Sequence, residues 1–426
     1  MDALKFKDVP EMAQIKPTPF HCSIEQRKLG EMLTLINIAK ITPPTFESLD
    51  ETGNFGISSA WLHSAKERWC HNFQWSTYED NINSFPNFTI SLTDRDGETM
   101  KIHFVALFSK KKDAVPLLLL HGWPGNFLEF LGILSLLAGT HTEEDLPYHV
   151  IVPSLPGYAF SSKPPLNKEF TTYDVAALMD QLMICLGFGD GYVVQGGDIG
   201  AKIARILAAK YESFNYCPVL NPTRQKEEGI LDVEREALPR GDQFLERGTG
   251  YSTEQATKPS TIGLVLGSNP IALLAWIAEK FIDWSDKTPS LDTILESVSL
   301  YWLTETFPTS IYPYREEIPG PGNRRQAGVL HQKAHGLLLV SQRAPPNPCF
   351  VGRYDRKPGL PSPPYQDYCT KAALTTATTN VKYQTGIELT HPIISSKPKT
   401  QDRPTPVSSS PEIPGSDQKA YCQLHQ

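Results

Sequence analysis

The stretch Tyr192-Val-Val-Gln-Gly-Gly-Asp-Ile-Gly200 joins a short apolar strand to a helix of small residues through a glycine-rich turn. Gly196, Gly197 and Gly200 are expected to leave room for a sharp reversal of the backbone, which lifts the side chain at its apex clear of the strand. That side chain is Asp198. A carboxylate needs no deprotonation before it attacks an sp³ carbon, so the pattern predicts a nucleophile that forms an alkyl ester.

Two other interpretations of this stretch stay open on these residues alone. A dinucleotide-binding turn needs the pattern GxGxxG, and Gln195 stands where its first glycine belongs. A structural turn in which Asp198 only caps the following helix uses the same residue types. Further motifs have to decide between a nucleophile, a cofactor turn and a cap.

A second glycine-rich turn, His121-Gly-Trp-Pro-Gly125, follows the apolar run 115–120. In the α/β-hydrolase fold, the turn after this strand carries one of two backbone N–H groups that hold a developing oxyanion. The N–H groups of Trp123 and Ile199 are therefore predicted to form an oxyanion hole. His121 belongs to the turn itself, and we expect it to make a structural hydrogen bond. The loop 153–161, after the next apolar run, is expected to edge the same pocket.

Strands and helices are expected to alternate from residue 100 onward. Unbroken apolar runs fit strands that are buried on both faces, and they occur at 102–107, 115–120, 149–153, 192–195 and 214–220. An amphipathic helix is expected at 171–186, and a helix of small residues at 199–210. This alternation predicts an α/β fold with a mostly parallel sheet. Helices expected at 270–284 and 291–304 have no strand between them, which favours a lid over the sheet.

The two ends of the chain differ from this central part. Residues 1–112 are expected to form an N-terminal region with helices at 23–39 and 58–75, the second with a core cluster of Trp69, Phe73 and Trp75. Residues 113–342 are predicted to hold the α/β core, with its lid at about 222–317. Residues 343–426 are rich in proline, serine and threonine and lack apolar periodicity, so disorder is expected there.

Composition excludes several classes of function. The chain has 426 residues, 40% hydrophobic and 20% charged residues, and a net charge of −7 without a basic tract, which argues against nucleic acid as a partner. No apolar run approaches the ~18–20 residues of a membrane span, and the first residues lack an apolar signal core. A cytoplasmic location is therefore expected. The cysteines form no CxxC pair, which favours reduced thiols over a disulfide framework or a zinc site (Cys22, Cys70, Cys185, Cys217, Cys349, Cys369 and Cys422).

Over roughly residues 15–317 the sequence resembles the microsomal-type epoxide hydrolases, including soluble fungal members. The resemblance is carried by the two glycine-rich turns, by Gln74-Trp75-Ser76 and by Phe85-Pro-Asn-Phe88. Isoleucine follows the proposed nucleophile, as in this family, whereas haloalkane dehalogenases usually place tryptophan there. The resemblance implies an α/β-hydrolase fold with a helical lid and a preceding N-terminal meander region.

The resemblance also implies two lid tyrosines that hydrogen-bond the epoxide oxygen. One is Tyr251 in Gly250-Tyr-Ser-Thr-Glu-Gln-Ala-Thr-Lys-Pro259, and the other is Tyr314 in Tyr312-Pro-Tyr-Arg-Glu316. Phenols can donate a hydrogen bond or a proton as negative charge develops on the oxygen of the opening ring. The implied substrate is a small-molecule epoxide and the product a vicinal diol, without cofactor or metal. A homodimer is left open.

The general base of the family stays unassigned. The family's triad ends with a histidine near the carboxyl terminus and an acid before it, and no histidine after the lid stands in such a motif (His331, His335, His391 and His425). We therefore expect an ester on Asp198 and doubtful turnover. Two alternatives remain, a haloalkane dehalogenase-like hydrolase and a binding protein that keeps the pocket but lacks the base.

Overall fold

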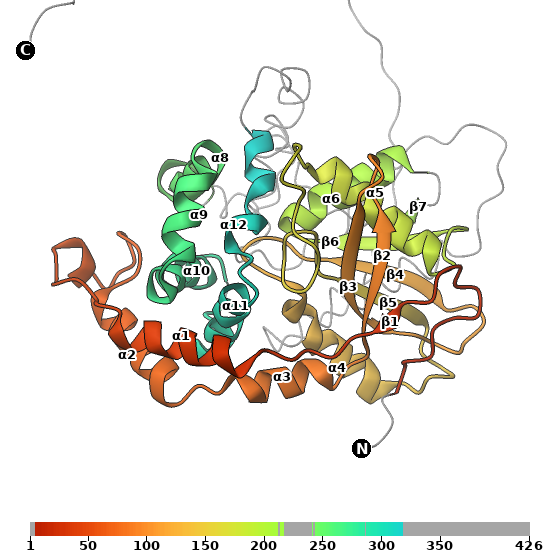
Figure 1. Ribbon diagram of the computed structural model, residues 1–426, viewed down its shortest axis with the longest axis horizontal. Coiled ribbons are helices and arrows are strands. Elements are labelled where there is room, and N and C mark those ends of the chain that lie inside the picture. Colours follow the sequence, from red (N-terminus) through yellow and green to blue (C-terminus); the bar gives the residue numbers. More distant parts are fainter. Residues whose placement is uncertain (1–4, 212–213, 217–240, 242, 286, 318–426) are drawn as a thin grey trace, which may run out of the picture. The chain divides into compact units, whose positions relative to one another are not determined.

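The computed structural model of the chain describes residues 5–211, 214–216, 241, 243–285 and 287–317 (Figure 1). The four histidines after the lid and the proline-rich tail lie outside the described residues. The predicted division of the chain at residues 112 and 342 stays a prediction.

The described strands form one mixed sheet of seven strands in the order β1-β2-β3-β5-β4-β6-β7. Its strands β5, β4, β6 and β7 are parallel, as expected, and β1, β2 and β3 extend it with antiparallel pairs. Their bounds are Thr18–Pro19 (β1), Asn87–Thr93 (β2), Thr99–Leu107 (β3), Val115–Leu120 (β4), Tyr148–Pro153 (β5), Tyr192–Gly196 (β6) and Phe214–Tyr216 (β7).

The helices fall into three groups along the chain. The first comprises α1 (Gln26–Ile38), α2 (Ser59–His71) and α3 (Trp75–Asn83), and the second α4 (Leu131–Thr140), α5 (Thr172–Cys185) and α6 (Asp198–Lys210). The third comprises α8 (Gly250–Thr257), α9 (Pro259–Gly267), α10 (Pro270–Asp283), α11 (Leu291–Leu303) and α12 (Phe307–Ser310). Short turns of 3-10 or π-helix also occur along the chain: η1 (Glu47–Leu49), η2 (Phe127–Phe130), η3 (Phe244–Gly248) and η4 (Tyr312–Glu317).

Local sequence signals explain where the main helices begin. α5 starts with a capping box, because the Thr171 side chain accepts from the backbone of the first turn while Asp174 accepts from the backbone of Thr171. α10 is capped by Asn269 and has Pro270 in its first turn, where the missing N–H costs nothing. α11 is capped by Ser290, whose side chain accepts from the N–H of Thr293 at 3.2 Å.

Two expectations for the N-terminal region were wrong. The helix expected over 58–75 ends at His71, and a separate helix, α3, begins at Trp75. The strand β2 was not expected at all, although Asn87–Thr93 alternates between buried and more exposed positions toward its end, the pattern of a strand with one buried face. The predicted strand at 214–220 is seen for its first three residues, and the remainder lies outside the described part.

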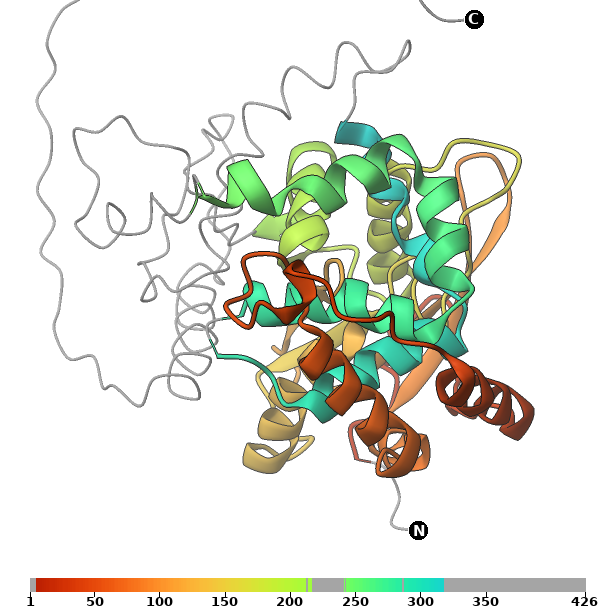
Figure 2. The ribbon, with the colours of Figure 1, turned by 90° about the vertical axis from the view of Figure 1, so that its left-hand side faces the viewer.

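In Figure 1 helices α8, α9 and α10 lie at the left with α1 and α2, and the strands lie at the right. Figure 2 looks from that left-hand side, so these helices lie in front. Contacts of α1 with α10 and α11, and of α3 with α11, join the two groups. Arg68 on α2 donates two hydrogen bonds to Asp292 on α11, at 2.8 and 2.6 Å. These contacts hold the lid helices against the N-terminal region.

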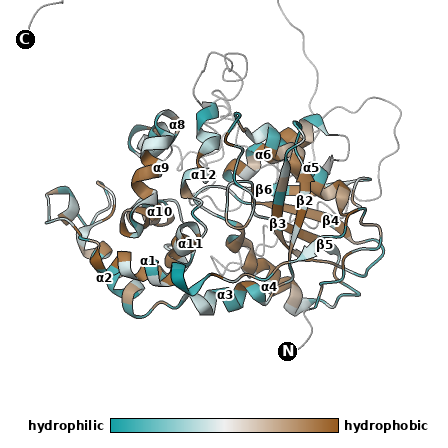
Figure 3. Ribbon diagram, in the orientation of Figure 1, coloured by the Kyte–Doolittle hydropathy of each residue, from teal (hydrophilic) through white to brown (hydrophobic). Residues whose placement is uncertain are grey.

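The core follows the apolar runs of the sequence. The central strands and α9 are coloured as hydrophobic in Figure 3. The predicted aromatic core cluster is confirmed, because Trp69, Phe73 and Trp75 are 0%, 8% and 4% exposed. The buried Trp69 indole donates to Ser299 Oγ on α11 at 3.0 Å, so its one polar atom is satisfied.

Candidate active site

The backbone turns sharply between β6 and α6, with Asp198 at the apex. Asp198 has φ +49°, a left-handed conformation that is costly for a residue other than glycine. A Cβ at Gly196 would overlap the backbone of Gly200, and a Cβ at Gly200 would overlap the carbonyl groups of Leu120 and His121. Gly197 differs from our expectation: it has open space around it, so only Gly196 and Gly200 are required by close packing.

The two glycine-rich turns meet at the carboxyl ends of neighbouring parallel strands, β4 and β6. The N–H of Trp123 donates to Asp198 Oδ1 at 2.9 Å across a sequence separation of 75 residues. A Cβ at Gly122 would overlap the Asp198 side chain, so this glycine permits the contact. The arrangement places a strong backbone donor on the Asp198 carboxylate.

Ile199 supplies the second predicted backbone donor. It lies in the first turn of α6, whose first N–H groups have no acceptor within the helix. The positive end of a helix dipole also favours negative charge at this end. The Trp123 N–H contacts the Asp198 carboxyl group, and the Ile199 donor of the predicted oxyanion hole stays a prediction.

The predicted lid tyrosines gather around Trp123. The Tyr251 ring, on α8, stacks on Trp123 with centroids 5.4 Å apart, and the Tyr314 ring, on η4, meets Trp123 edge-on at 5.7 Å. The two tyrosine rings are 5.8 Å apart. Tyr312 lies apart from this group, because its hydroxyl donates to the carbonyl of Pro156 at 3.2 Å. The structure thus brings Asp198, Trp123, Tyr251 and Tyr314 together.

The predicted structural role of His121 is confirmed. Its Nε2 accepts from the N–H of Leu155 at 3.1 Å, so its Nδ1 carries the proton that faces the Gly122 carbonyl at 3.2 Å. Burial lowers the pKa of His121 to about 4, and the ring is neutral. The loop 153–161 lies beside it, since Tyr158 packs edge-on against His121 at 4.8 Å.

A carboxyl group near Asp198 was not expected from the sequence. Glu129 lies on η2, just beyond the His121–Gly125 turn. Burial, and then the charge of Asp198, raise the pKa of Glu129 to about 8. Glu129 follows the last glycine of His121-Gly-Trp-Pro-Gly125 by four residues, so a motif extended by four positions would have included it.

Other kinds of site find little support among the described residues. No group of three or more histidine, cysteine, aspartate or glutamate side chains is arranged for a metal there. Cys22, Cys70 and Cys185 are free thiols. Within the described ranges no single helix is long and apolar enough to cross a membrane, and only α9 with α10, bent by 117°, satisfies length and composition as a pair.

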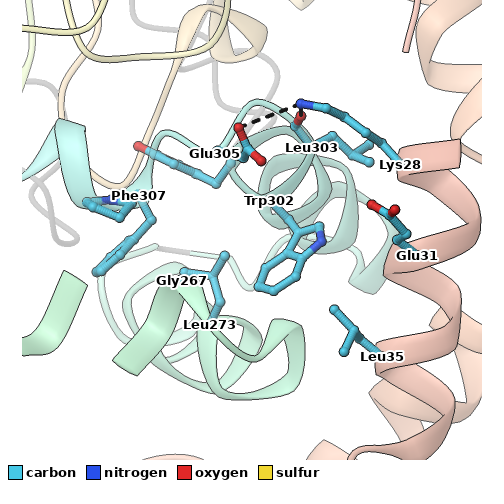
Figure 4. A pocket seen from close by; sticks show the side chains of 11 residues that line it. Lys28, Glu31, Leu35, Gly267, Leu273, Trp302, Leu303, Glu305 and Phe307 are labelled. Carbon is cyan, nitrogen blue, oxygen red and sulfur yellow. Dashed lines mark hydrogen bonds and ion pairs between the residues drawn. The ribbon is translucent and has the colours of Figure 1, made fainter. Parts of the chain in front are cut away.

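A separate pocket of about 180 Å³ lies between α1, the lid helices and the segment after α11 (Figure 4). Lys28 pairs with Glu305 at 3.7 Å on its rim. Phe307 lines this pocket and also lies 6.5 Å from Trp123, ring to ring, so the pocket adjoins the aromatic cluster from outside. None of the predicted site residues lines it.

Comparison with known proteins assigns these motifs to a family. A family model described as "Epoxide hydrolase N terminus" matches residues 17–130, and one described as "alpha/beta hydrolase fold" matches residues 115–218. A provisionally named epoxide hydrolase of Dothistroma septosporum is 43% identical over 324 residues, which cover 74% of this chain and 77% of that relative. The chain belongs to the epoxide hydrolase family.

Solved structures of epoxide hydrolases agree with the fold described above. The Aspergillus niger epoxide hydrolase is 48% identical, with a TM-score of 0.69 over 74% of this chain and 82% of that one. The juvenile hormone epoxide hydrolase of the silkworm Bombyx mori is 27% identical, with a TM-score of 0.59 over 75% and 81%. The predicted α/β-hydrolase fold and the predicted membership of the epoxide hydrolase family are confirmed.

Proposed function

We propose that the chain acts on a small-molecule epoxide and converts it to a vicinal diol through an ester on Asp198. The observation that supports this most directly is the position of Asp198, held at 2.9 Å by the Trp123 N–H beside the stacked Tyr251 ring. Membership of the epoxide hydrolase family supports the same reaction.

In the first step one oxygen of Asp198 forms a bond to an epoxide carbon, and the bond from that carbon to the ring oxygen breaks. Tyr251 and Tyr314 donate to the ring oxygen, and one of them transfers a proton to the new alkoxide. Their rings are 5.8 Å apart, which suits two donors that converge on one oxygen. The product of this step is a hydroxyalkyl ester of Asp198.

In the second step water attacks the ester carbonyl, and the N–H groups of Trp123 and Ile199 hold the oxyanion that forms. This step needs a base that removes a proton from the water. Among the described residues, His121 cannot serve, because both of its ring nitrogens face backbone groups. Turnover is therefore expected to be slow or absent unless another group supplies the base.

The test is covalent labelling with an epoxide such as styrene oxide, followed by intact-protein mass spectrometry. The wild type should gain one adduct mass on Asp198, and Asp198→Asn should gain none, because an amide is a far weaker nucleophile. Ser268→Ala, on the exposed end of α9, serves as a handling control. Equal labelling of Asp198→Asn would remove Asp198 from the nucleophile role.

A haloalkane dehalogenase would use the same aspartate, and Tyr251 with Tyr314 favours the epoxide over the halide. Chloride release from a panel of haloalkanes, without diol formation from epoxides, would reverse that assignment. A cytoplasmic location and a homodimer stay predictions for this chain.

A further inference from the structure

Glu129 occupies an unusual position for a carboxyl group. Its side chain has accessible surface, yet surrounding protein desolvates it strongly enough to raise its pKa to about 8. The Glu129 side chain is therefore open to water although protein atoms lie around it. Among the described residues no hydrogen bond to this carboxyl group is formed, which leaves its oxygens able to bind water.

The carboxyl groups of Glu129 and Asp198 contact the same short turn. A Cβ at Gly125 would overlap Glu129 Oε2, and a Cβ at Gly122 would overlap Asp198. The same virtual Cβ at Gly125 lies 3.4 Å from the carbonyl oxygen of Gly122, so the two contact points are adjacent. Tyr301 fixes this turn, because its hydroxyl donates to the carbonyl of Gly125 at 2.9 Å.

We propose that Glu129 is the general base of the second step and takes a proton from the water that attacks the Asp198 ester. This inference rests on the proposed function of Asp198. It assigns the missing base to a residue inside the α/β core, four residues beyond the turn whose Trp123 N–H contacts Asp198.

The charges of the two carboxyl groups are coupled. In the free protein Glu129 is protonated at neutral pH, because burial and the charge of the Asp198 carboxylate raise its pKa to about 8. Ester formation removes the Asp198 charge, so the pKa of Glu129 falls below about 8 and the group ionises nearer neutral pH. Within the described part of the chain, Tyr301 on α11 also interacts with this carboxyl group, and it stays neutral because burial raises its pKa far above the usual value.

The protons balance over one cycle. When the ring opens, the alkoxide takes a proton from a lid tyrosine, and Glu129 returns one to that tyrosine through water. Water then adds to the ester carbonyl carbon while Glu129 accepts its proton. The bond between that carbon and the alkyl oxygen breaks, the leaving alkoxide takes the proton from Glu129, and the new Asp198 carboxylic acid protonates Glu129 again. One epoxide and one water give one diol.

The experiment compares the full-length wild type with Glu129→Gln in single-turnover reactions with styrene oxide. Glutamine resembles the protonated glutamate of the free protein, so ester formation should change less than about threefold. Diol release should fall about 100-fold or more, the usual contribution of a general base. In the wild type, the rate of diol release should rise with pH and reach its plateau before about pH 8. This rise should be absent in Glu129→Gln.

Glu296→Gln is the matched control, because burial alone raises the pKa of Glu296 to about 7 and Asp198 has no part in that shift. It should leave both rates unchanged. If Glu129→Gln takes up no label, Glu129→Asp replaces it. Diol release that still rises with pH in that variant supports the base role, whereas release at the wild-type rate that does not change with pH contradicts it.

Each other outcome is decisive. Normal labelling with undiminished diol release in Glu129→Gln overturns the proposal and places the base elsewhere, with His391 the next residue to test. A wild-type ester that never releases diol overturns it too, while the role of Asp198 survives. No labelling of the wild type removes the proposed function itself, and the Glu129 proposal with it.

Discussion

Gly200 is the position where a single methyl group should disturb the site most directly. A Cβ there would overlap the Leu120 carbonyl oxygen and would lie 2.7 Å from the His121 carbonyl oxygen, whereas ordinary contacts begin at 3.4 Å. These neighbours are backbone atoms at the end of β4 and cannot rotate away. The first turn of α6 would have to move by more than 0.7 Å, because the contact with the His121 oxygen falls short by that amount and the contact with the Leu120 oxygen is closer still.

Gly200→Ala should therefore act on both stability and chemistry. Overpacking of this size typically costs ~1–3 kcal/mol. Because Asp198 sits at the start of the displaced helix and a misplacement of about 1 Å can cost roughly 10²-fold in rate, ester formation should slow by ~10- to 100-fold. Urea denaturation measures the first effect, and the rate of adduct formation by mass spectrometry measures the second.

The matched control is Gly132→Ala on α4, where no atom lies within 4 Å of the added Cβ. Alanine there should stabilise the helix by about 0.5–1 kcal/mol and leave ester formation unchanged. If Gly200→Ala behaved like this control in both assays, the close approach of α6 to the end of β4 would not be what positions Asp198.

Three further predictions concern the lid and its attachment. The double variant Tyr251→Phe, Tyr314→Phe should slow ester formation by ~10²-fold or more, as loss of oxyanion donors does elsewhere, and an unchanged rate would show that the lid assignment is wrong. The Lys280 side chain is 4% exposed, and its ammonium pairs with Glu279 and lies 5.0 Å from the Tyr251 ring centroid. Lys280→Met should remove ~0.5–2 kcal/mol of cation–π interaction and slow ester formation by roughly 2- to 30-fold, and an unchanged rate would contradict this. Trp69→Phe leaves the buried Ser299 hydroxyl without its donor, so the free energy of unfolding in urea should fall by ~1–3 kcal/mol. Ester formation per folded molecule should not change, and an unchanged unfolding midpoint would contradict the prediction.

Local features of the site were readable from the sequence. The strand, the turn and the helix around Asp198 follow from apolar runs and glycines at fixed offsets, because backbone sterics act between near neighbours. The cap of α11 by Ser290 is equally local, since a cap bonds to N–H groups within its own first turn. Gly197 is an exception, because it matches the motif although the structure leaves open space around it.

Errors arose where a local pattern had two solutions. The run 58–75 is compatible with one long helix, and the chain instead breaks at Asn72 to let Trp75 begin α3. β2 was missed because a short alternating segment is stabilised by its partner strand, β3, with which it pairs over its full length.

The sequence by itself determined the chemistry that is available: a carboxylate on a strained turn, a glycine-rich turn after the preceding strand, and tyrosines that match a family pattern. Only the tertiary structure decided which of these groups meet. The stack of Tyr251 on Trp123, the ammonium of Lys280 over that tyrosine, and the coupling of Glu129 to Asp198 join segments that are far apart in the chain. Such contacts depend on how helices and strands pack, and burial then sets the pKa of each group, so neither can be read from residue types and spacings.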